Sequence, residues 1–597
     1  MKMSALITLI LSLGMPYFSY AKPLAISFDS PMLLEGIKKQ LKEPKLLKSQ
    51  KNLPGVFASL SPNNGAELIK EYKNLGIIII DTEDTSDLKE LSKKGFLNIL
   101  EDWDIPAPPK INAYKKIQAN ASLAPLGLIE EPWGIDAINA EATWNHVNFG
   151  SGVRVLILDT GIDKDHPDIA DNFEKGKNFT EVNEDAPYDY FDDVGHGTHV
   201  AGTIAATGDH SKLVGVAPKA TILAGKVCAT ERCSGFAILD GLEWALEQEV
   251  DIVNLSLGGH APNQVMADAY RILQLSGITV VAASGNEEED SVGYPGAYST
   301  TIAVGAVNEE LEKTDFSNWG EKLDVVAPGA NVISSVPQGT GIEPSMELSI
   351  QTENGLTIET IDAEFMPFIG TGRKTISELE LVYVGLGQEE DVSEADLEGK
   401  VALIRRGEIS FFDKARNAVR AGAEAVLIFN DSEDPDFDET KPAVGTLGDD
   451  VRAEIFVLGI SKEVGLALLK GLRATDEKVT FSAEILKTDY QAQQGTSMAA
   501  PHVTGLVALM IAANPELNPQ QIKKILKETS TELDGDNSEN QLGSGLVNSE
   551  AAVELALSTK GVKLTEDDVA KEIIEEQPSR EIRIPAICLI MPSLCFD

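Results

Sequence analysis

Apolar runs alternate with helical patterns along the middle of the chain, and this alternation restricts the fold more than any other feature. Val153–Leu158 is almost entirely apolar, as expected of a strand that is buried on both faces. The pattern continues through a strand at 220–227, a helix at 235–250, a strand at 251–259, a helix at 266–277 and a strand at 278–286. Repeated strand–helix units place parallel strands side by side and cover them with helices. The sequence therefore predicts an α/β fold, a parallel sheet with helices on both faces.

Three short segments carry an Asp, a His and a Ser that suit nucleophilic acyl transfer: VLILDTGID with Asp159, GHGTHVAG with His196, and GTSMAAPH with Ser497. Asp159 directly follows a predicted strand, so it lies at the carboxyl edge of the sheet, where open α/β folds build their sites. His196 begins a predicted helix, and His199 lies one turn later, so spacing alone does not tell which imidazole is the base. Ser497 begins another predicted helix, whose N-terminal N–H groups favour a developing oxyanion.

These strings resemble the catalytic signatures of the subtilisin-like serine peptidases, the subtilases, and their order Asp, His, Ser is that of subtilisin. The resemblance continues through EPWGIDAINA, GVAPKA, IVNLSLGG, ASGN, GYPGAY, IAVGAV and DVVAPG, and covers roughly 133–339 and 490–556. It implies a subtilisin-like fold, His196 as the base, and Asn286 of ASGN as the side-chain donor to the oxyanion. It also implies that the backbone N–H of Ser497 is the second donor.

The same resemblance implies the walls of the primary substrate pocket. They are the segments SLGG and AASG, with the candidate substrate-binding residues Ser256, Leu257, Gly258, Gly285 and Glu287. Small residues in these walls leave room for a large apolar side chain. Because Glu287 lies at the pocket rim in this alignment, we hypothesise that the pocket also accepts basic side chains.

Calcium is the ion that the resemblance implies, as a structural cofactor. Asp168 in DTGIDKDHPD and Asp209 in ATGDHSKLVG match side-chain ligands of a calcium site in the family, and loop oxygens suit a hard cation. The second loop departs from the usual family composition, with Asp209 where Asn is common, so solvated loop carboxylates stay an alternative. His196 and His199 do not read as metal ligands, because there is no HExxH motif and no third ligand at a sensible spacing.

The chain divides into six segments by this interpretation. They are a signal peptide (1–21), an inhibitory prodomain (22–125), a first catalytic part (126–340), an inserted protease-associated (PA) domain (341–488), a second catalytic part with the nucleophile (489–556) and a C-terminal extension (557–597). The prodomain has a helix-like AELIKEYKNLG, a strand-like IIIID, a helix-like SDLKELSKKG and a loop-rich DWDIPAPPK, which suggest a small α+β unit. Self-cleavage is expected between about 120 and 131, in an exposed linker. Residues 399–431 read strand, loop, amphipathic helix, strand, and are similar to a PA domain.

Charge and cysteine usage set the surroundings of the site. With 50 Lys+Arg against 94 Asp+Glu, the net charge of −44 repels nucleic acid and anionic membranes. Four cysteines fall in two close pairs, Cys228 with Cys233 and Cys588 with Cys595, and each pair closes a small loop in an oxidising compartment unless the thiols stay free or pair crosswise.

We therefore expect a secreted serine endopeptidase, monomeric, that acts on protein or peptide substrates through an acyl-enzyme and is inhibited by its own prodomain until self-cleavage. The rival interpretation is a secreted binding protein with a silent peptidase site, which holds ligands through the PA insertion.

Overall fold

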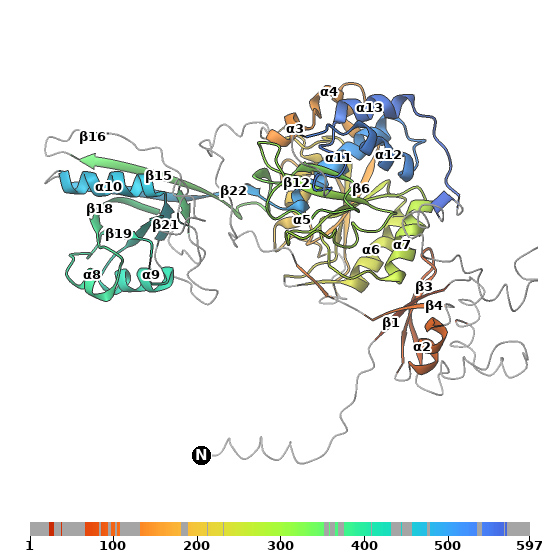
Figure 1. Ribbon diagram of the computed structural model, residues 1–597, viewed down its shortest axis with the longest axis horizontal. Coiled ribbons are helices and arrows are strands. Elements are labelled where there is room, and N and C mark those ends of the chain that lie inside the picture. The colour runs from red at the N-terminus through yellow and green to blue at the C-terminus, as the bar shows by residue number, and fades with distance from the viewer. Residues whose placement is uncertain are drawn as a thin grey trace, which may run out of the picture. The chain divides into compact units, whose positions relative to one another are not determined.

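The computed structural model describes residues 132–180, 189–350 except 210, 212 and 231, 375–431 except 408, 456–533 except 475–477, and 540–565 (Figure 1). It also describes short stretches at 23–28, 38, 66–82, 85–93, 97–101, 104–107, 351, 357–358, 365–367, 443 and 568–569. The predicted signal peptide, the cleavage region at 120–131 and the second cysteine pair lie outside the described residues. Contacts divide the chain into two compact units, Met1–Trp103 with Asn263–Ala269 and Gln577–Asp597, and Asp104–Pro262 with Tyr270–Glu576.

The first unit contains a four-stranded antiparallel sheet of order β2-β3-β1-β4, and the helix α2 lies between β3 and β4 in the sequence. Its elements are β1 (Leu24–Phe28), β2 (Glu67–Tyr72), β3 (Ile77–Asp81), α2 (Ser86–Lys93) and β4 (Leu97–Glu101). The helix predicted at 66–76 is wrong, because 67–72 forms β2 and pairs with the strongly apolar β3 across a turn at Gly76 (φ +65°). Pairing with that buried neighbour outweighs the helix propensity of Glu, Leu and Lys.

The second unit is built on a seven-stranded sheet of order β13-β12-β11-β10-β6-β8-β7, in which every neighbouring pair is parallel. Its strands are β6 (Arg154–Asp159), β7 (Phe173–Asn178), β8 (Thr221–Lys226), β10 (Ile252–Leu255), β11 (Thr279–Ala283), β12 (Ile302–Val307) and β13 (Val325–Pro328). From β6 the chain first builds one side of the sheet with β7 and β8, and then the other side from β10 to β13. The order therefore reverses between β6 and β10, which is where sheets of this kind form a crevice at the carboxyl ends of their strands.

Both faces of this sheet are covered, as predicted, and β6 shows why. Val155 and Ile157 belong to the main core cluster, together with side chains of α5 (His196–Ala205) and α11 (Thr496–Ala513). Successive strand residues point to opposite faces, and Leu158 accordingly contacts Gly241 in α6 (Gly235–Gln248) on the other face. A helix is also present at α7 (Gln264–Leu275).

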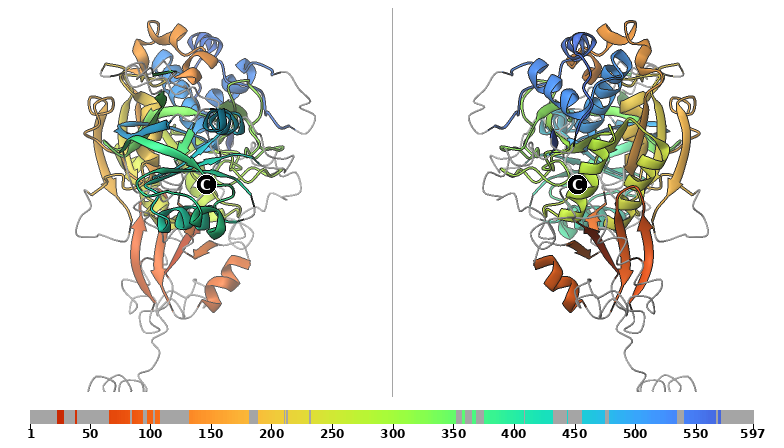
Figure 2. Two further views of the ribbon diagram at one scale, coloured as in Figure 1. Left: turned by 90° about the vertical axis from the view of Figure 1, so that its left-hand side faces the viewer. Right: turned by 90° about the vertical axis from the view of Figure 1, so that its right-hand side faces the viewer.

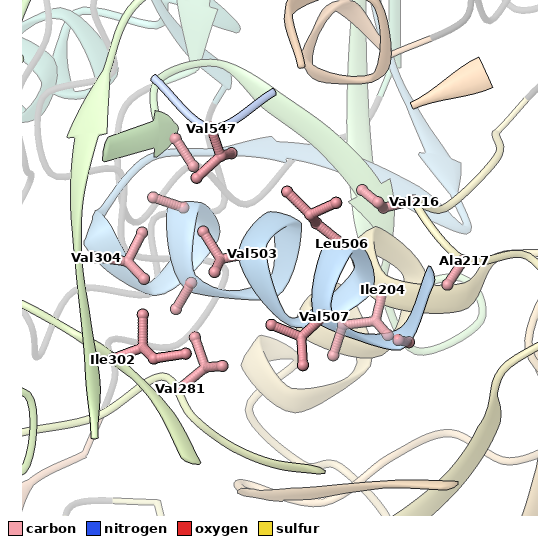
Figure 3. Close-up of a cluster of buried hydrophobic side chains, with 14 of the residues drawn as sticks. Ile204, Val216, Ala217, Val281, Ile302, Val304, Val503, Leu506, Val507 and Val547 are labelled. Atoms are coloured by element: carbon pink, nitrogen blue, oxygen red, sulfur yellow. The ribbon is translucent and has the colours of Figure 1, made fainter. Parts of the chain in front are cut away.

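The helix that carries the nucleophile segment is the centre of the core. Figure 3 shows Val503, Leu506 and Val507 of α11 pointing among side chains of the strands and of α5, and all three are completely buried. By length and composition α11 could cross a membrane, but 78% of the relevant window is buried inside the protein, as expected of a core helix.

The remaining elements of the catalytic part surround this core. They are α3 (Trp133–Ala137), α4 (Glu141–Trp144), the 3-10 turn η4 (Asn148–Gly150), β14 (Val332–Ser335), which pairs with β23 (Tyr490–Gln493), α12 (Pro519–Thr529) and α13 (Ser549–Ser558). Two short strands, β5 (Asp104–Pro106) and β9 (Arg232–Ser234), pair with each other antiparallel. The segment DWDIPAPPK, predicted as a loop, therefore contains the strand β5, which pairs with β9.

The insertion forms a mixed eight-stranded sheet of order β16-β15-β22-β18-β19-β20-β21-β17. Its elements are β15 (Gly341–Gln351), β16 (Thr357–Ile358), β17 (Phe365–Pro367), β18 (Thr375–Tyr383), α8 (Glu389–Ser393), β19 (Val401–Arg405), α9 (Phe411–Arg420), β20 (Ala425–Phe429), β21 (Phe456–Ile460), α10 (Lys462–Ala474) and β22 (Lys478–Thr488). Separate apolar clusters cover the two faces, one with Leu468 of α10 and the other with Ala415 and Ala418 of α9. Figures 1 and 2 show α10 on one side of the sheet and α8 and α9 on the other. The strand–loop–helix–strand pattern predicted for 399–431 is confirmed as β19, α9 and β20.

Candidate active site

Three adjacent strands of the parallel sheet end at the predicted site. Asp159 is the last residue of β6, Ser256 follows the end of β10, and Asn286 follows β11 after two residues. Because these strands are neighbours and parallel, their carboxyl ends bring the three residues to one edge of the sheet.

Asp159 and His196 form a buried pair. The Nδ1 atom of His196 lies 2.8 Å from Oδ1 of Asp159 and 3.0 Å from Oδ2. The Thr160 N–H also donates to Oδ1, at 2.7 Å, which fixes the carboxylate. The helix approaches this closely because residue 197 is Gly, where a Cβ would lie 2.1 Å from the Gly161 carbonyl oxygen. Since Nδ1 donates to the carboxylate, the neutral ring leaves Nε2 as a proton acceptor.

The pKa of His196 is raised by its carboxylate neighbours. Burial lowers the pKa of His196, but the negative charge of Asp159 and its hydrogen bond, together with the charge of Asp192, outweigh burial and raise it above the ordinary value. The imidazolium that forms during proton transfer is stabilised in this way.

His199 has different hydrogen-bond partners from His196, and this difference distinguishes the two imidazoles, which sequence spacing did not. Its Nε2 lies 2.9 Å from the carbonyl oxygen of Val332 and 3.1 Å from that of Gln491, so it donates to the backbone of β14 and β23. Burial, with a contribution from His196, lowers the pKa of His199 to about 3. This ring is a neutral core histidine, and the geometry favours His196 as the base.

Ser497 lies in the first turn of α11 and is half-buried. Its Oγ donates to Sδ of Met498 at 3.4 Å and not to His196, while its carbonyl oxygen accepts a hydrogen bond from Ser256 Oγ at 2.9 Å. A Cβ on Gly495 (φ +149°) would lie 2.9 Å from Ser497 Oγ and 3.6 Å from Asn286 Nδ2. Both polar atoms therefore border the same small space, which glycine leaves open.

The amide of Asn286 is oriented by the residue that precedes the serine. Its Oδ1 accepts hydrogen bonds from the backbone N–H of Thr496 at 2.8 Å and from Thr496 Oγ1 at 3.0 Å. Because the oxygen is engaged on that side, Nδ2 is left to donate elsewhere. The Ser497 N–H, at the helix N-terminus, has no acceptor within its own helix.

The predicted pocket residues lie around this edge. Ser256 anchors the nucleophile segment, Leu257 is buried, and Gly258 packs against the carbonyl oxygen of Tyr294. Gly285 has φ +110°, and its N–H lies 3.2 Å from Thr496 Oγ1. The Glu287 carboxylate accepts hydrogen bonds from the Asn286 N–H at 2.9 Å and from Asn318 Nδ2 at 2.7 Å, so one of its oxygens is already used by the protein.

A segment of the predicted prodomain lies along β9. Ile105 of β5 pairs with Cys233, and it is only 5% exposed. A Cβ on Gly259, at the end of the SLGG wall, would lie 3.9 Å from Ile105 Cγ1. Arg232 and Asp104 add an exposed ion pair at 3.0 Å. The two strands form a two-stranded antiparallel sheet.

The first cysteine pair is joined, as predicted. A disulfide links Cys228 and Cys233, both of which are buried, and the backbone N–H of Cys228 donates to the Asp159 carbonyl oxygen at 3.1 Å. The disulfide therefore joins the loop beside Asp159 to the strand that pairs with β5.

The two predicted calcium ligands are placed differently. Asp168 is buried, and its Oδ2 accepts hydrogen bonds from Ser211 Oγ at 2.8 Å and Tyr490 Oη at 2.6 Å, while Oδ1 has no partner. One unpartnered carboxylate oxygen suits a hard cation. Asp209 is exposed, and among the described residues no three His, Cys, Asp or Glu gather as a metal cluster. Asp168 fits as one ligand, and calcium binding by the pair stays a prediction.

Sequence reasoning missed the residues that hold this machinery. Asp192 is buried beside α5, where its carboxylate accepts hydrogen bonds from the N–H groups of Gly195 (2.7 Å) and Thr198 (2.8 Å) and from the hydroxyl of Thr160 (2.8 Å). Asn318 holds the loop of Asn286 in a similar way. An acidic residue shortly before a predicted helix is an N-capping signal that could have pointed to Asp192, whereas nothing local marks Asn318.

The chain is similar to known proteins over much of its length. The Subtilase family (peptidase S8) matches residues 150–360 and 437–545, more than half of the chain, and the PA domain family matches residues 356–468. The intracellular serine protease of Paenibacillus polymyxa is 43% identical over 216 residues, which are 35% of this chain and 66% of that protein. Subtilisin E of Bacillus subtilis (strain 168) is 42% identical over 214 residues, 35% of this chain and 55% of that protein.

The match thus spans somewhat less than two thirds of these two relatives. A crystal structure of the psychrophilic subtilisin-like protease Apa1 from Pseudoalteromonas sp. AS-11 is similar with a TM-score of 0.49 and 22% identity, over 72% of this chain and 99% of that one. On the family match, the chain belongs to the subtilase family and carries a PA domain.

Proposed function

We propose that this protein is a serine endopeptidase that hydrolyses peptide bonds of proteins through an acyl-enzyme. Two observations carry the proposal: the buried pair of Asp159 and His196, and the small space at Gly495 that Ser497 Oγ and Asn286 Nδ2 both border. The helices that carry His196 and Ser497, α5 and α11, are in contact. Family membership supports the reaction type, and the local geometry supports the role of each residue.

In the reaction, Ser497 Oγ turns from Met498 toward His196 and attacks the substrate carbonyl carbon as Nε2 takes its proton. The same proton then passes to the departing amine, and a water molecule repeats the steps on the ester. Asp159 holds the ring in the tautomer with Nδ1–H and stabilises its cation. Asn286 Nδ2 and the Ser497 N–H donate to the oxyanion; loss of one such donor costs about 100- to 1,000-fold in rate, a magnitude established on a subtilisin.

The deciding experiment compares the parent with Ser497→Ala. The parent is expected to hydrolyse casein and to be labelled by a serine-directed fluorophosphonate, and the variant is expected to do neither. A parent that stays unlabelled while fully folded would favour the rival function, a binding protein with a silent peptidase site.

We further propose that residues 22–125 act as an inhibitory prodomain, within the six-segment division predicted from the sequence. The pairing of β5 with β9 supports this, because a strand on that edge excludes a substrate strand from it. Replacing Ile105 with Glu should weaken the contact, and the full-length chain should then gain activity sooner after synthesis. Ile69→Glu is the matched control, because Ile69 lies in the same segment but is 54% exposed. Equal activation times for the two variants would count against inhibition through this strand.

We propose secretion and self-cleavage on the N-terminal pattern, and N-terminal sequencing of the mature form tests both. An N-terminus between about 120 and 131, absent in Ser497→Ala, is the expected result. Retention of the chain in the cytoplasm would contradict secretion.

We also propose that calcium binds at Asp168 and stabilises the fold. Its Oδ1 supplies one oxygen ligand, and the hydroxyls of Ser211 and Tyr490 hold the carboxylate in place. The Ser497→Ala protein should unfold at a lower temperature in EDTA than in millimolar calcium, and Asp168→Asn should remove that difference. A difference that persists in Asp168→Asn would place the ion elsewhere.

A further inference from the structure

Asn318 lies in the loop between β12 and β13 and has no exposed surface. All hydrogen bonds of its side-chain amide go to one neighbouring segment, the loop 284–289 that carries Asn286. Its Oδ1 accepts hydrogen bonds from the N–H groups of Glu287 and Glu289, both at 3.0 Å. Its Nδ2 donates to the Ser284 carbonyl oxygen at 3.3 Å and to Glu287 Oε2 at 2.7 Å. An amide has two donor and two acceptor positions, so all four are satisfied by this loop.

Backbone hydrogen bonds join the same two loops. The Asn318 N–H donates to the Gly285 carbonyl oxygen at 3.0 Å, and the Glu288 N–H donates to that of Phe316 at 3.0 Å. Ser284 Oγ donates to the Asn318 carbonyl oxygen at 3.1 Å. The loop of Asn286 is therefore attached on both sides of that residue.

Glu287 completes a ring around Asn286. Its Oε2 accepts both the Asn286 N–H, at 2.9 Å, and Asn318 Nδ2. A Cβ on Gly285 would lie 2.2 Å from Asn318 Nδ2 and 2.6 Å from Glu287 Oε2, so only glycine allows the two side chains to come this close. Thr496 fixes the side-chain oxygen of Asn286, whereas Asn318 and Glu287 fix its backbone.

We propose that Asn318 and Glu287 are positioning residues that hold the oxyanion donor Asn286 in its reactive place, and that the Glu287 carboxylate serves this clamp and not selection of basic substrate side chains. The inference rests on the proposed peptidase function. Oxyanion donors must lie at hydrogen-bonding distance, about 2.7 to 3.1 Å, from the oxygen on which the charge develops, and a misplacement of about 1 Å can cost about 100-fold in rate.

The kinetic test is a double-mutant cycle on a chromogenic tetrapeptide substrate. Asn318→Ala should lower kcat by about 10- to 100-fold with KM changed less than about twofold, because the donor acts on the transition state. In an Asn286→Ala background the same substitution should lower kcat less than about twofold, since the group that it positions is gone. An equal loss in both backgrounds, or a loss that appears in KM, would overturn the proposal.

Asn514→Ala is the matched control. Asn514 also donates its amide to two backbone carbonyl oxygens, those of Ala556 (2.9 Å) and Thr559 (2.7 Å), but it touches none of the catalytic residues. It should leave kcat unchanged, and a matching loss in this variant would show that Asn318→Ala acts through general destabilisation. Glu287→Gln should keep the parent's ratio of cleavage rates for lysyl and apolar substrates. A selective loss of lysyl cleavage would show that Glu287 selects basic side chains in the substrate pocket.

A structural measurement separates this inference from the proposed function. Hydrogen exchange at the amides of 284–289 should be faster in Asn318→Ala and Glu287→Ala than in the parent and in Asn514→Ala, in a Ser497→Ala background that prevents autolysis. Unchanged exchange would overturn the clamp even in an active enzyme. An inactive parent with the expected exchange would overturn the peptidase assignment instead. Glu287 is exposed, so its variant is available if Asn318→Ala does not fold.

Discussion

Two neutral histidines in the core should make the catalytic domain sensitive to acid. His199 donates to the backbone of β14 and β23, and His502 in α11 has Nδ1 at 2.8 Å from the Met498 carbonyl oxygen. Burial is the main cause that lowers the pKa of His199 to about 3 and that of His502 to about 4. The unfolded chain takes up a proton on each ring near pH 6.5, and the folded protein does not. The stabilisation is therefore fully present above that pH and is lost as the pH falls toward the folded-state values.

The size of the effect follows from the two shifts. Each group removes about 1.4 kcal/mol of unfolding free energy per pH unit between the two pKa values. At pH 4.5 each ring therefore costs about 2.5 kcal/mol relative to pH 7.5, and the two together cost about 5 kcal/mol. Since domains are stable by about 5 to 15 kcal/mol in total, this loss is enough to unfold a marginal one.

The assay is denaturant unfolding of Ser497→Ala at pH 7.5 and pH 4.5, followed by tryptophan fluorescence. Four of the five tryptophans lie between 133 and 319 and none lies in 341–488, so the signal reports the catalytic domain. His199→Gln keeps a donor for the backbone carbonyl groups but does not titrate. It should lose about 2.5 kcal/mol less than the parent between the two pH values, and His502→Gln should behave alike. Carboxylates contribute equally to parent and variant, so parallel losses would refute the neutral, buried state of these rings.

Three further changes should have measurable effects. Asp192→Asn removes a negative charge that helps to raise the pKa of His196, the proposed base, so the acidic limb of the kcat/KM profile should move to lower pH, and an unmoved limb would argue against that influence. Replacing Cys228 and Cys233 together with Ala opens a six-residue loop and should cost about 2 kcal/mol in thermal unfolding, which an equally stable variant would contradict. Leu506→Ala leaves a cavity beside α11 and should cost about 2 to 5 kcal/mol, against less than about 0.5 kcal/mol for Leu557→Ala, which is 57% exposed; similar costs would mean that the core packing is described wrongly.

The parallel sheet could be predicted because its strands are buried on both faces. Such strands read as continuous apolar runs, and β6, β8, β10 and β11 are all recovered at their expected places. The predicted order of elements also implied the covering helices α6 and α7. The prediction failed at β2, where the sequence alternates little and is rich in helix formers, and where pairing with β3 decides the conformation.

Within the candidate site, the sequence predicted which groups would react, but the spacing of the two histidines did not predict which imidazole is the base. His196 and His199 lie on one helix with similar neighbours, and only the resemblance to subtilases chose between them. In the structure the choice follows from the partners: one ring faces a carboxylate and the other faces two carbonyl oxygens. A spacing of three residues places two side chains near one another but does not say what faces each of them.

The residues that hold the site escape sequence reasoning for a physical reason. A nucleophile, a base and an oxyanion donor each need a particular chemical group, so few residue types qualify and their local settings are distinctive. Asn318 only needs to supply two donors and two acceptors at the right place, and that place is set by how the loop after β12 folds against the loop after β11. Since the two loops are about thirty residues apart and neither is regular, their register is decided by tertiary packing. A positioning residue of this kind can therefore be recognised only once the distances are known, whereas Asp192 comes shortly before a predicted helix, where a capping signal marks it in the sequence.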